Sequence, residues 1–232
     1  MKLFRLRIAI LAIVSSVVPA LAGDALGIRN CTWCHGTSAQ GFANAPRLAG
    51  QRTEYLWNQL ARFAAHRRDN PLSRQYMWSA AAALTPWKAR DLAIYFSTLP
   101  PEAASDGVKE LAAVGRTLYE EGSPETNLAS CAACHGPNAE GIGEIPRLGG
   151  LSYAYLKRRL EEWGDGYDAA AAPPMPGIAS KLYPQEIDAL ASYLSFVNGS
   201  PFVFYECAAT TQIGKAPYGT GCTSVFASGH RP

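Results

Sequence analysis

Two pentapeptides of the form Cys-x-x-Cys-His, at residues 31–35 and 131–135, constrain this chain more than any other feature. In each, the two thiols stand one helical turn apart, so both can form thioethers to the vinyl groups on one edge of a porphyrin. The histidine that follows is then held beneath the iron as an axial ligand. The pattern predicts two covalently attached haem c groups, held by the thiols of Cys31, Cys34, Cys131 and Cys134 and ligated by His35 and His135.

Three other uses of these cysteines compete with haem attachment. Two Cys-x-x-Cys pairs could bind one zinc ion through four thiolates, but this leaves the two adjacent histidines without a role. A thioredoxin-like redox pair requires a βαβ context, whereas the flanking segments have the patterns of helix and loop. A disulfide within a Cys-x-x-Cys loop is a poor structural staple. We therefore favour haem.

Two methionines are candidates for the second axial ligand of each iron. Apart from Met1, the chain has only Met77 and Met175, which follow the two motif histidines by 42 and 40 residues. A methionine can also fill a gap in a core, but such packing does not account for two at matched positions. Thioether ligation would raise the reduction potential and saturate the iron, which suits electron transfer.

The N-terminus has the features of a secretory signal. Lys2, Arg5 and Arg7 precede an apolar run, and small residues occupy the cleavage positions before Gly23. The run is short for a membrane span of about 20 residues, so we expect removal of residues 1–22 in preference to retention as an anchor. We expect no other transmembrane segment. Export to the periplasm agrees with covalent haem and an oxidising compartment.

Charge is distributed unevenly along the chain. Without residues 1–22 it carries 18 basic and 19 acidic side chains, a balance that argues against a nucleic-acid-binding protein. Residues 23–100 hold nine basic and four acidic side chains, whereas residues 101–200 hold seven and fourteen. We expect the basic half to be steered toward an acidic redox partner and the acidic half toward a basic one. The alternative is two solvated surfaces without functional polarity.

The chain contains an internal repeat with a period of about 100 residues. This shift aligns both haem motifs and the Pro-Arg-Leu segments at residues 46–48 and 146–148. Apolar stripes and caps predict helices over residues 53–66, 85–96, 108–121, 153–163 and 184–197, joined by loops rich in glycine and proline. The predicted fold class is all-α, with domains at residues 23–100 and 101–199 and a C-terminal extension at residues 200–232.

The order of these features resembles class I cytochrome c, and two copies behind a signal peptide resemble the dihaem cytochrome c4 group. The resemblance covers roughly residues 24–198 and is carried by Cys-x-x-Cys-His, Gly-x4-Pro-Arg-Leu-x-Gly, an aromatic-bearing helix, a methionine and a final helix with a tyrosine. It implies two tandem cytochrome c domains whose haems face one another across the domain interface. It also implies that the carbonyls of Pro46 and Pro146 accept hydrogen bonds from the histidine rings. Gly115 and Tyr119 would lie where the first and last helices of the second domain cross.

Three further features concern the haem environment and the extent of this resemblance. Arg47 and Arg147 suit haem propionates, because a guanidinium pairs well with carboxylates, and the alternative is an ordinary solvated arginine. Only residues 23–30 precede the first haem motif once the signal is removed, too few for a counterpart of the helix at 108–121. In the C-terminal extension, Cys207 and Cys222 have no following histidine, and in an exported protein we expect them to form a disulfide.

These features favour an electron carrier that accepts single electrons at one haem and delivers them from the other. Its partners would be redox proteins, such as a membrane-bound oxidase or a periplasmic dehydrogenase, and it needs no catalytic residues of its own. One alternative is a cytochrome subunit of a larger dehydrogenase or reductase, docked by the C-terminal extension. Another is a dihaem enzyme, a peroxidase or a sulfur-compound oxidoreductase, which requires an exchangeable position on the iron.

Overall fold

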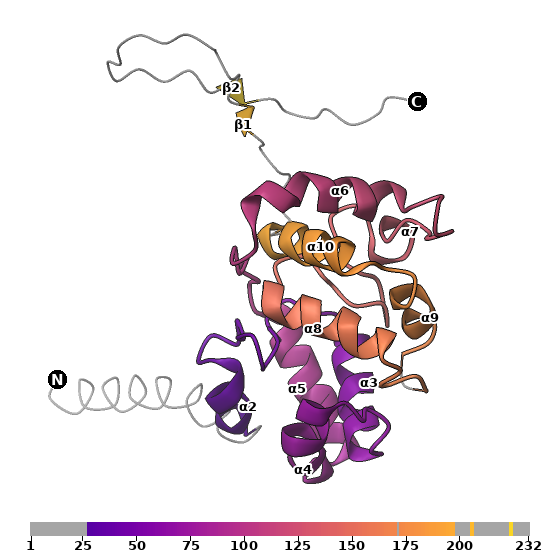
Figure 1. The fold of residues 1–232 in the computed structure, drawn as a ribbon. Coiled ribbons are helices and arrows are strands. Elements are labelled where there is room, and N and C mark those ends of the chain that lie inside the picture. Colours follow the sequence, from indigo (N-terminus) through magenta and orange to yellow (C-terminus); the bar gives the residue numbers. More distant parts are fainter. Residues whose placement is uncertain (1–26, 171, 198–204, 207–222, 225–232) are drawn as a thin grey trace, which may run out of the picture.

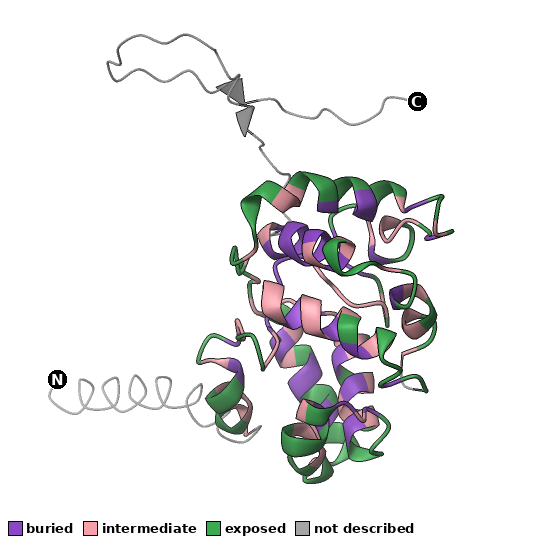
Figure 2. Ribbon diagram, viewed as in Figure 1, coloured by how far each residue is buried: buried purple, intermediate pink, exposed green. Residues whose placement is uncertain are grey.

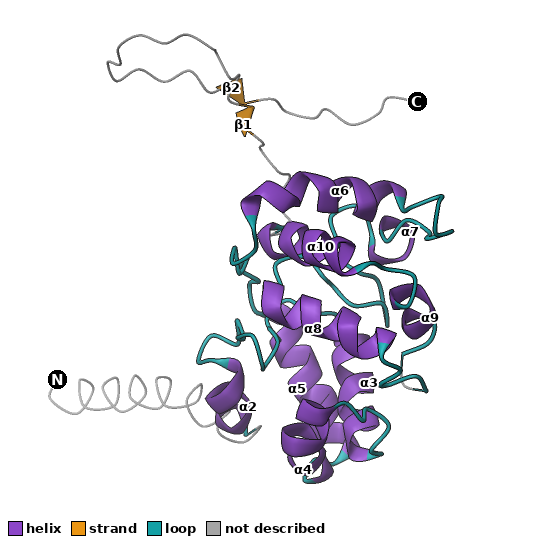
Figure 3. Cartoon of the chain, in the orientation of Figure 1, coloured by secondary structure: helices purple, strands orange, loops and turns teal. Residues whose placement is uncertain are grey.

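The structure, a computed structural model, describes residues 27–170, 172–197, 205–206 and 223–224. Within these residues the chain is helical apart from loops and one short strand pair (Figure 1, Figure 3). The helices of the first half are α2 (Ile28–His35), α3 (Thr53–Ala64), the π-helical turn η1 (Ser73–Met77), α4 (Trp78–Ala82) and α5 (Pro86–Thr98). Those of the second half are the 3₁₀ turn η2 (Lys109–Leu111), α6 (Ala112–Glu121), α7 (Ala132–His135), α8 (Tyr153–Gly164), α9 (Met175–Ala179) and α10 (Pro184–Phe196).

Each half has a hydrophobic core of its own. The first core gathers buried side chains of α3 and α5, among them Leu56 and Phe96. The second gathers buried side chains of α6, α8 and α10, among them Tyr119, Leu156 and Leu190. The apolar positions recur at helical spacing, so each helix buries one face and leaves the other to solvent. The chain therefore folds as two helical units, in agreement with the all-α prediction.

Local sequence sets the start of the last helix in each half. The side-chain oxygen of Thr85 accepts a hydrogen bond from the N–H of Lys88 at 3.3 Å, and a proline follows at the first position of α5. At the start of α10, the carboxylate of Glu186 accepts from the N–H of Tyr183 at 2.8 Å. These caps satisfy amide groups that a helix end otherwise leaves without partners.

A close crossing of α6 and α10 completes the second half. At this crossing a Cβ on Gly115 would lie 1.9 Å from the carbonyl oxygen of Ala189, so only glycine fits. One turn later, Tyr119 is buried against Tyr193 with ring centroids 5.6 Å apart. The helices thus cross where the family resemblance implies. With α6 on one side and α8 on the other, α10 is buried along most of its length (Figure 2).

The first half differs from the second at this point. Its described part begins with α2, so no described helix crosses α5 as α6 crosses α10. Asp91 on α5 is exposed, whereas its counterpart on α10, Ala189, is buried beneath Gly115. Trp87, in the first turn of α5, is 76% exposed. The face of α5 that corresponds to the buried face of α10 is therefore exposed to solvent at these positions.

The strands β1 (Tyr205–Glu206) and β2 (Thr223–Ser224) form an antiparallel pair in which Glu206 lies opposite Thr223. The predicted disulfide partners, Cys207 and Cys222, lie outside the described residues, as does the predicted signal at residues 1–22. Among the helices that the structure describes, none combines the length and the apolar character needed to cross a bilayer.

Candidate haem-binding sites

The two Cys-x-x-Cys-His motifs adopt the same local structure. The first lies in α2, and the second begins at Cys131 and continues through α7. In both motifs the first cysteine is half-buried, the second is exposed and the histidine is buried. The burial pattern of residues 31–40 is repeated position by position over residues 131–140. Each motif therefore presents two thiols and one imidazole from a single helical turn.

A hydrogen bond to a proline carbonyl orients each motif histidine. Nδ1 of His35 lies 2.7 Å from the carbonyl oxygen of Pro46, and Nδ1 of His135 lies 2.9 Å from that of Pro146. A carbonyl can only accept a hydrogen bond, so Nδ1 carries the proton and Nε2 keeps its lone pair. Burial lowers the pKa of both histidines by more than the proline contact raises it. Both rings are therefore neutral at neutral pH, the form that ligates iron.

A tight loop after each motif places the proline. The N–H of Gly41 donates to the carbonyl of His35 at 2.9 Å, and the N–H of Gly141 donates to that of His135 at 2.8 Å. A Cβ on Gly41 would lie 2.3 Å from the main-chain nitrogen of Arg47, so this loop requires glycine. The same loop geometry in both halves explains why both histidines meet a carbonyl eleven residues later.

The four motif cysteines are free thiols within the described part of the chain. Burial raises the pKa of Cys31, an effect partly opposed by Lys88, and raises that of Cys131 to about 11. A thioredoxin-like pair needs a lowered thiol pKa and a βαβ context, whereas Cys31 and Cys131 are half-buried in helical surroundings. The described residues also contain no group of three or more histidine, cysteine or carboxylate side chains arranged to hold a metal ion. The four cysteines therefore do not form a zinc site.

The residues present at each site fit a covalently attached haem. Two unpaired thiols stand one turn apart, and beside them an imidazole offers Nε2 while its other nitrogen is occupied. The cysteines would hold the porphyrin edge and the histidine would hold the iron. A haem bound in this way supplies a one-electron iron couple.

The two methionines predicted to complete the iron coordination lie on different elements. Met77 is the last residue of η1, whereas Met175 is the first residue of α9, and both are half-buried. Next to Met77, Trp78 stacks on the ring of His66 with centroids 4.0 Å apart and donates from Nε1 to the carbonyl of Arg68 at 2.7 Å. These contacts fix the chain just after Met77. Iron ligation by both methionines stays a prediction.

Arg47 lies at the junction of the two halves. It is only 3% exposed, and its guanidinium donates to the carbonyls of Gly150, at 2.9 Å, and of Gly149 and Glu102. Burial lowers its pKa to about 10, with a further contribution from Arg147. The alternative of a solvated arginine is therefore wrong for Arg47. Contact with a haem propionate stays a prediction for both arginines.

Gln51 connects the first half to the loop of the second haem site, a role that its sequence context does not indicate. Its Nε2 donates to the carbonyl of Arg147 at 2.9 Å, and its Oε1 accepts from the N–H of Arg147 at 2.7 Å. Arg147 directly follows Pro146, the carbonyl partner of His135. The counterpart of Gln51 in the repeat is Leu151, so comparison of the two copies does not reveal this contact.

The outer surfaces of the two motifs differ in chemistry. Trp33, between the cysteines of the first motif, is 89% exposed, and Phe42 in the following loop is 61% exposed. A Cβ on Gly36 would lie 3.6 Å from the ring of Phe42, whereas a Cβ on Gly136 would lie 2.5 Å from the carboxylate of Glu140. The glycine that ends the first motif therefore lies beside the ring of Phe42, whereas the glycine that ends the second lies beside the carboxylate of Glu140.

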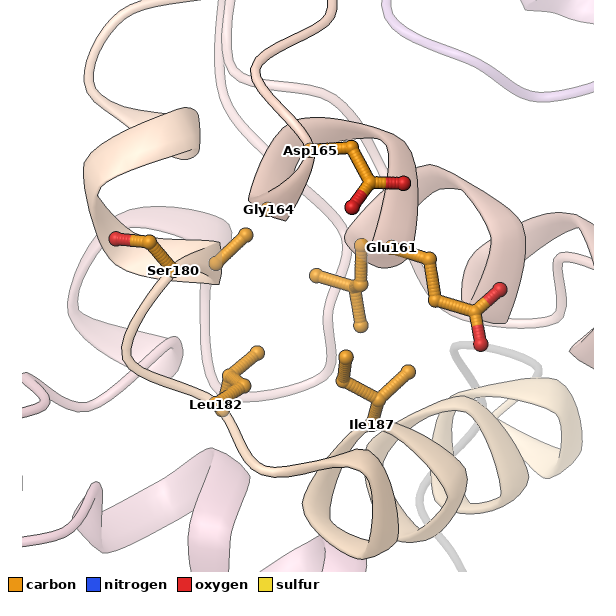
Figure 4. A pocket seen from close by; sticks show the side chains of 8 residues that line it. Glu161, Gly164, Asp165, Ser180, Leu182 and Ile187 are labelled. Carbon is orange, nitrogen blue, oxygen red and sulfur yellow. The ribbon is translucent and has the colours of Figure 1, made fainter.

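A cavity of about 410 Å³ lies between α8, α9 and α10 (Figure 4). Leu160, Leu182 and Ile187 form its apolar wall, and Glu161 and Asp165 extend from the end of α8 beside it. Its lining does not include the motif cysteines or the motif histidine. This cavity is therefore separate from the haem-attachment residues.

Comparison with known proteins extends these observations. Residues 112–197 match the family model described as Cytochrome c. Cytochrome c4 of Thiocapsa roseopersicina is 36% identical over 180 residues, which cover 75% of this chain and 90% of that protein. A protein of Stutzerimonas stutzeri named as a thiosulfate dehydrogenase electron acceptor is 36% identical over 174 residues, which cover 72% of this chain and 79% of that protein.

Solved structures agree with the sequence comparison. Cytochrome c4 of Acidithiobacillus ferrooxidans matches with a TM-score of 0.67 and 31% identity, covering 72% of this chain and 99% of that chain. Thiosulfate dehydrogenase (TsdBA) of Marichromatium purpuratum matches with a TM-score of 0.62 and 34% identity, covering 75% of this chain and 38% of that chain. Identity at this level over most of this chain, together with the structural match, establishes the family. This chain is a member of the cytochrome c4-like dihaem c-type cytochromes.

Proposed function

We propose that the chain is a dihaem electron carrier that passes single electrons between redox proteins. The observation that carries this proposal is the duplicated site, in which two free thiols accompany a histidine oriented by a proline carbonyl. Cys31, Cys34, Cys131 and Cys134 would hold two haem c groups, with His35 and His135 on one side of the irons and Met77 and Met175 on the other. With both axial positions filled by the protein, the chain needs no catalytic residue and offers no open iron position.

A narrower candidate function is suggested by two of the relatives. Proteins of Stutzerimonas stutzeri and Thiomonas intermedia, 36% and 34% identical to this chain, are named as electron acceptors of thiosulfate dehydrogenase. We infer that this chain accepts electrons from a sulfur-compound dehydrogenase, either as a free shuttle or as a bound subunit. Reduction by thiosulfate in the presence of that enzyme, and co-purification with it, would distinguish these two arrangements.

The surface around the first motif suits contact with a partner. Trp33 and Phe42 expose aromatic surface next to the thiols that would hold the haem edge, and the first half carries an excess of basic side chains. Exposed tryptophans are enriched among residues that dominate binding energy. We infer that the electron donor docks on this aromatic face and that the acidic second half receives a basic partner.

We also propose that the protein is exported to the periplasm after removal of residues 1–22. The mature chain would then consist of domains at residues 23–100 and 101–199 and an extension at residues 200–232. We infer that Cys207 and Cys222 form a disulfide in this extension, because neither belongs to a haem motif and the proposed compartment is oxidising. Peptide mapping of the unreduced protein tests this pairing, and two free thiols would reject it.

An optical redox titration of the purified holoprotein tests the proposed function. We expect two one-electron transitions, low-spin spectra throughout, and a Met–iron charge-transfer band for both sites in the oxidised protein. A high-spin species in the resting protein, or turnover of peroxide, would instead support the dihaem enzyme. The narrower function is tested by adding thiosulfate together with a thiosulfate dehydrogenase. We expect this mixture to reduce the haems of this chain faster than thiosulfate alone does.

A further inference from the structure

A cluster of buried charged side chains lies where the end of α8 meets the first half. At its centre is Asp168, whose side chain is inaccessible to solvent. Its Oδ2 lies 2.6 Å from Nη2 of Arg159 in the same half and 3.7 Å from Nε of Arg68 in the other half. Both arginines are also buried, and Arg159 additionally pairs with Glu162. Charges removed from water in this way are costly unless their partners are held in place.

The same aspartate is bonded to the main chain of the opposite half. Its Oδ1 accepts from the N–H groups of Asp69 at 2.6 Å and Asn70 at 3.2 Å, and its Oδ2 accepts from Nδ2 of Asn70 at 3.1 Å. In return, the N–H of Asp168 donates to Oδ1 of Asp69 at 2.8 Å. One residue therefore carries hydrogen bonds and an ion pair across the boundary between the halves.

The repeat explains why this contact works with one acidic and one basic residue. Arg68 and Asp168 occupy equivalent positions, 100 residues apart, yet they face each other. Each also has a hydrogen-bond partner on the preceding helix of its own half, and these two partners are again 100 residues apart. Nη1 of Arg68 donates to Oε1 of Gln59 at 3.0 Å, and Nη2 of Arg159 donates to Oδ2 of Asp168. Identical residues at these positions would place two like charges together. Opposite charges instead favour pairing of the first half with the second.

This cluster holds the end of the interface that lies far from the linker. Arg47 and Gln51 join the halves near Gly150 and Arg147, close to where the chain crosses between them. Arg147 and Gly150 precede the twelve-residue helix α8, which is about 18 Å long, whereas Asp168 follows its C-terminal end. Without it the halves would stay tethered near the linker but would be free to hinge apart at the opposite end.

We propose that Asp168, through its pairing with Arg68, is a positioning residue that fixes the two haem domains at the separation needed for electron transfer between them. The proposal rests on the proposed dihaem function. It assigns to Asp168 no contact with either haem. The residue acts through the relative placement of the two domains. Asparagine at this position keeps an oxygen that accepts from Nδ2 of Asn70, so Asp168→Asn removes the charge and retains the Asn70 contact that supports η1 and Met77.

The test compares the Asp168→Asn holoprotein with the wild type. Losing one partner of a buried pair should raise the population of hinged, more open molecules by about a hundredfold. Small-angle X-ray scattering should then show a larger radius of gyration. Inter-haem electron transfer, followed after partial rapid reduction, should slow by about tenfold or more because transfer between held groups is sensitive to small misplacements. Each site's optical spectrum should stay that of the wild type, which shows that the domains remain folded.

Two further variants make the test decisive. Asp165→Asn removes an exposed carboxylate three residues earlier and should change neither scattering nor transfer. Arg68→Gln removes the charge from the other side of the pair, and a double variant with Asp168→Asn should slow transfer by less than the product of the two single effects. If Asp168→Asn and Arg68→Gln both fold and both keep the radius of gyration and the inter-haem transfer rate of the wild type, this inference is overturned and the proposed function is not affected. A wild-type protein without two redox centres would instead overturn the proposed function.

Discussion

At the scale of single residues, each motif histidine is prepared to bind iron by two independent effects. The proline carbonyl fixes the proton on Nδ1, and burial lowers the histidine pKa from its ordinary value of 6.5. Because the carbonyl belongs to the main chain, side-chain substitution at Pro46 or Pro146 does not delete it. The motif itself is readable from sequence, since the order of its residues is what the chemistry requires. The two methionines are candidate ligands only because of their matched spacing from the motif histidines, since no residue beside them identifies an iron ligand.

Replacing either methionine by alanine tests the proposed second axial ligands. Met77→Ala and Met175→Ala should each remove about half of the Met–iron charge-transfer absorbance, because one of two thioether bonds is lost. The midpoint potential of the affected site should fall by a sizeable part of the about 0.8 V range that axial ligands span. Spectroelectrochemistry measures both quantities, and each variant serves as the control for the other site. A variant that keeps the full band would show that its methionine is not a ligand.

Replacing an exposed tryptophan tests the proposed docking face. Trp33→Ala should lower the second-order rate of reduction by a partner dehydrogenase by about tenfold, the loss typical of an interface tryptophan. Its effect on unfolding free energy should stay within about 0.5 kcal/mol, because the side chain is exposed. Trp87→Ala is the matched control, since Trp87 is exposed on α5 outside the haem motif. Equal rates for both variants in stopped-flow measurements would remove the docking role from Trp33.

At the scale of helices, sequence predicts most elements because their signals are local. The predicted helices at residues 153–163 and 184–197 end within one residue of α8 and α10. The prediction for residues 53–66 overruns α3 by two residues, because His66 takes a left-handed φ of 55° that a helix does not allow. The π-helical turn η1 was not predictable. Its first residue donates to Oδ1 of Asn70, whose own placement depends on contact with the other half.

The crossing of α6 and α10 makes a direct prediction for stability. Gly115→Ala places a methyl group 1.9 Å from the carbonyl oxygen of Ala189, so the helices must move apart. The second domain should lose about 2 to 3 kcal/mol of unfolding free energy, as expected for overpacking against main chain. Urea titration, monitored through the second haem site, measures the loss.

A glycine without close neighbours provides the control for this prediction. A Cβ on Gly164 would meet none of the described atoms within 4 Å, so Gly164→Ala should leave the unfolding midpoint nearly unchanged. The first domain should be unaffected by either substitution, because it has a separate core. An equal midpoint for Gly115→Ala and Gly164→Ala would contradict the close crossing.

At the scale of the whole molecule, the interface is the part that sequence does not disclose. Arg47, Gln51 and Asp168 each contact partners about 100 residues away, so no local pattern marks them. The repeat does show that position 68 is basic where position 168 is acidic. The sequence does not indicate that these two equivalent positions form an ion pair, because only the fold brings them together. Duplication predicts two domains, and three-dimensional contact is needed to say how they meet.

The charged interface predicts a change of shape at low pH. Burial alone would raise the pKa of Asp168. Attraction to Arg159 and Arg68, the hydrogen bond from Arg159 and the hydrogen bond from the N–H of Asp69 together lower it. A carboxyl whose pKa is depressed in the closed form stabilises that form above its ordinary pKa of 3.8 and loses this effect as pH falls further. The radius of gyration should therefore rise below about pH 4 in the wild type. The Asp168→Asn protein should lack this transition, and an identical acid transition in both proteins would contradict the assignment.

The account depends most on covalent attachment of two haems, and intact-mass spectrometry of the denatured holoprotein tests this directly. It predicts that the mature polypeptide carries the added mass of two haem groups, that Cys31→Ser with Cys34→Ser leaves one, and that Cys131→Ser with Cys134→Ser leaves the other. A denatured chain with the mass of the bare polypeptide, or with one haem in the wild type, would contradict it.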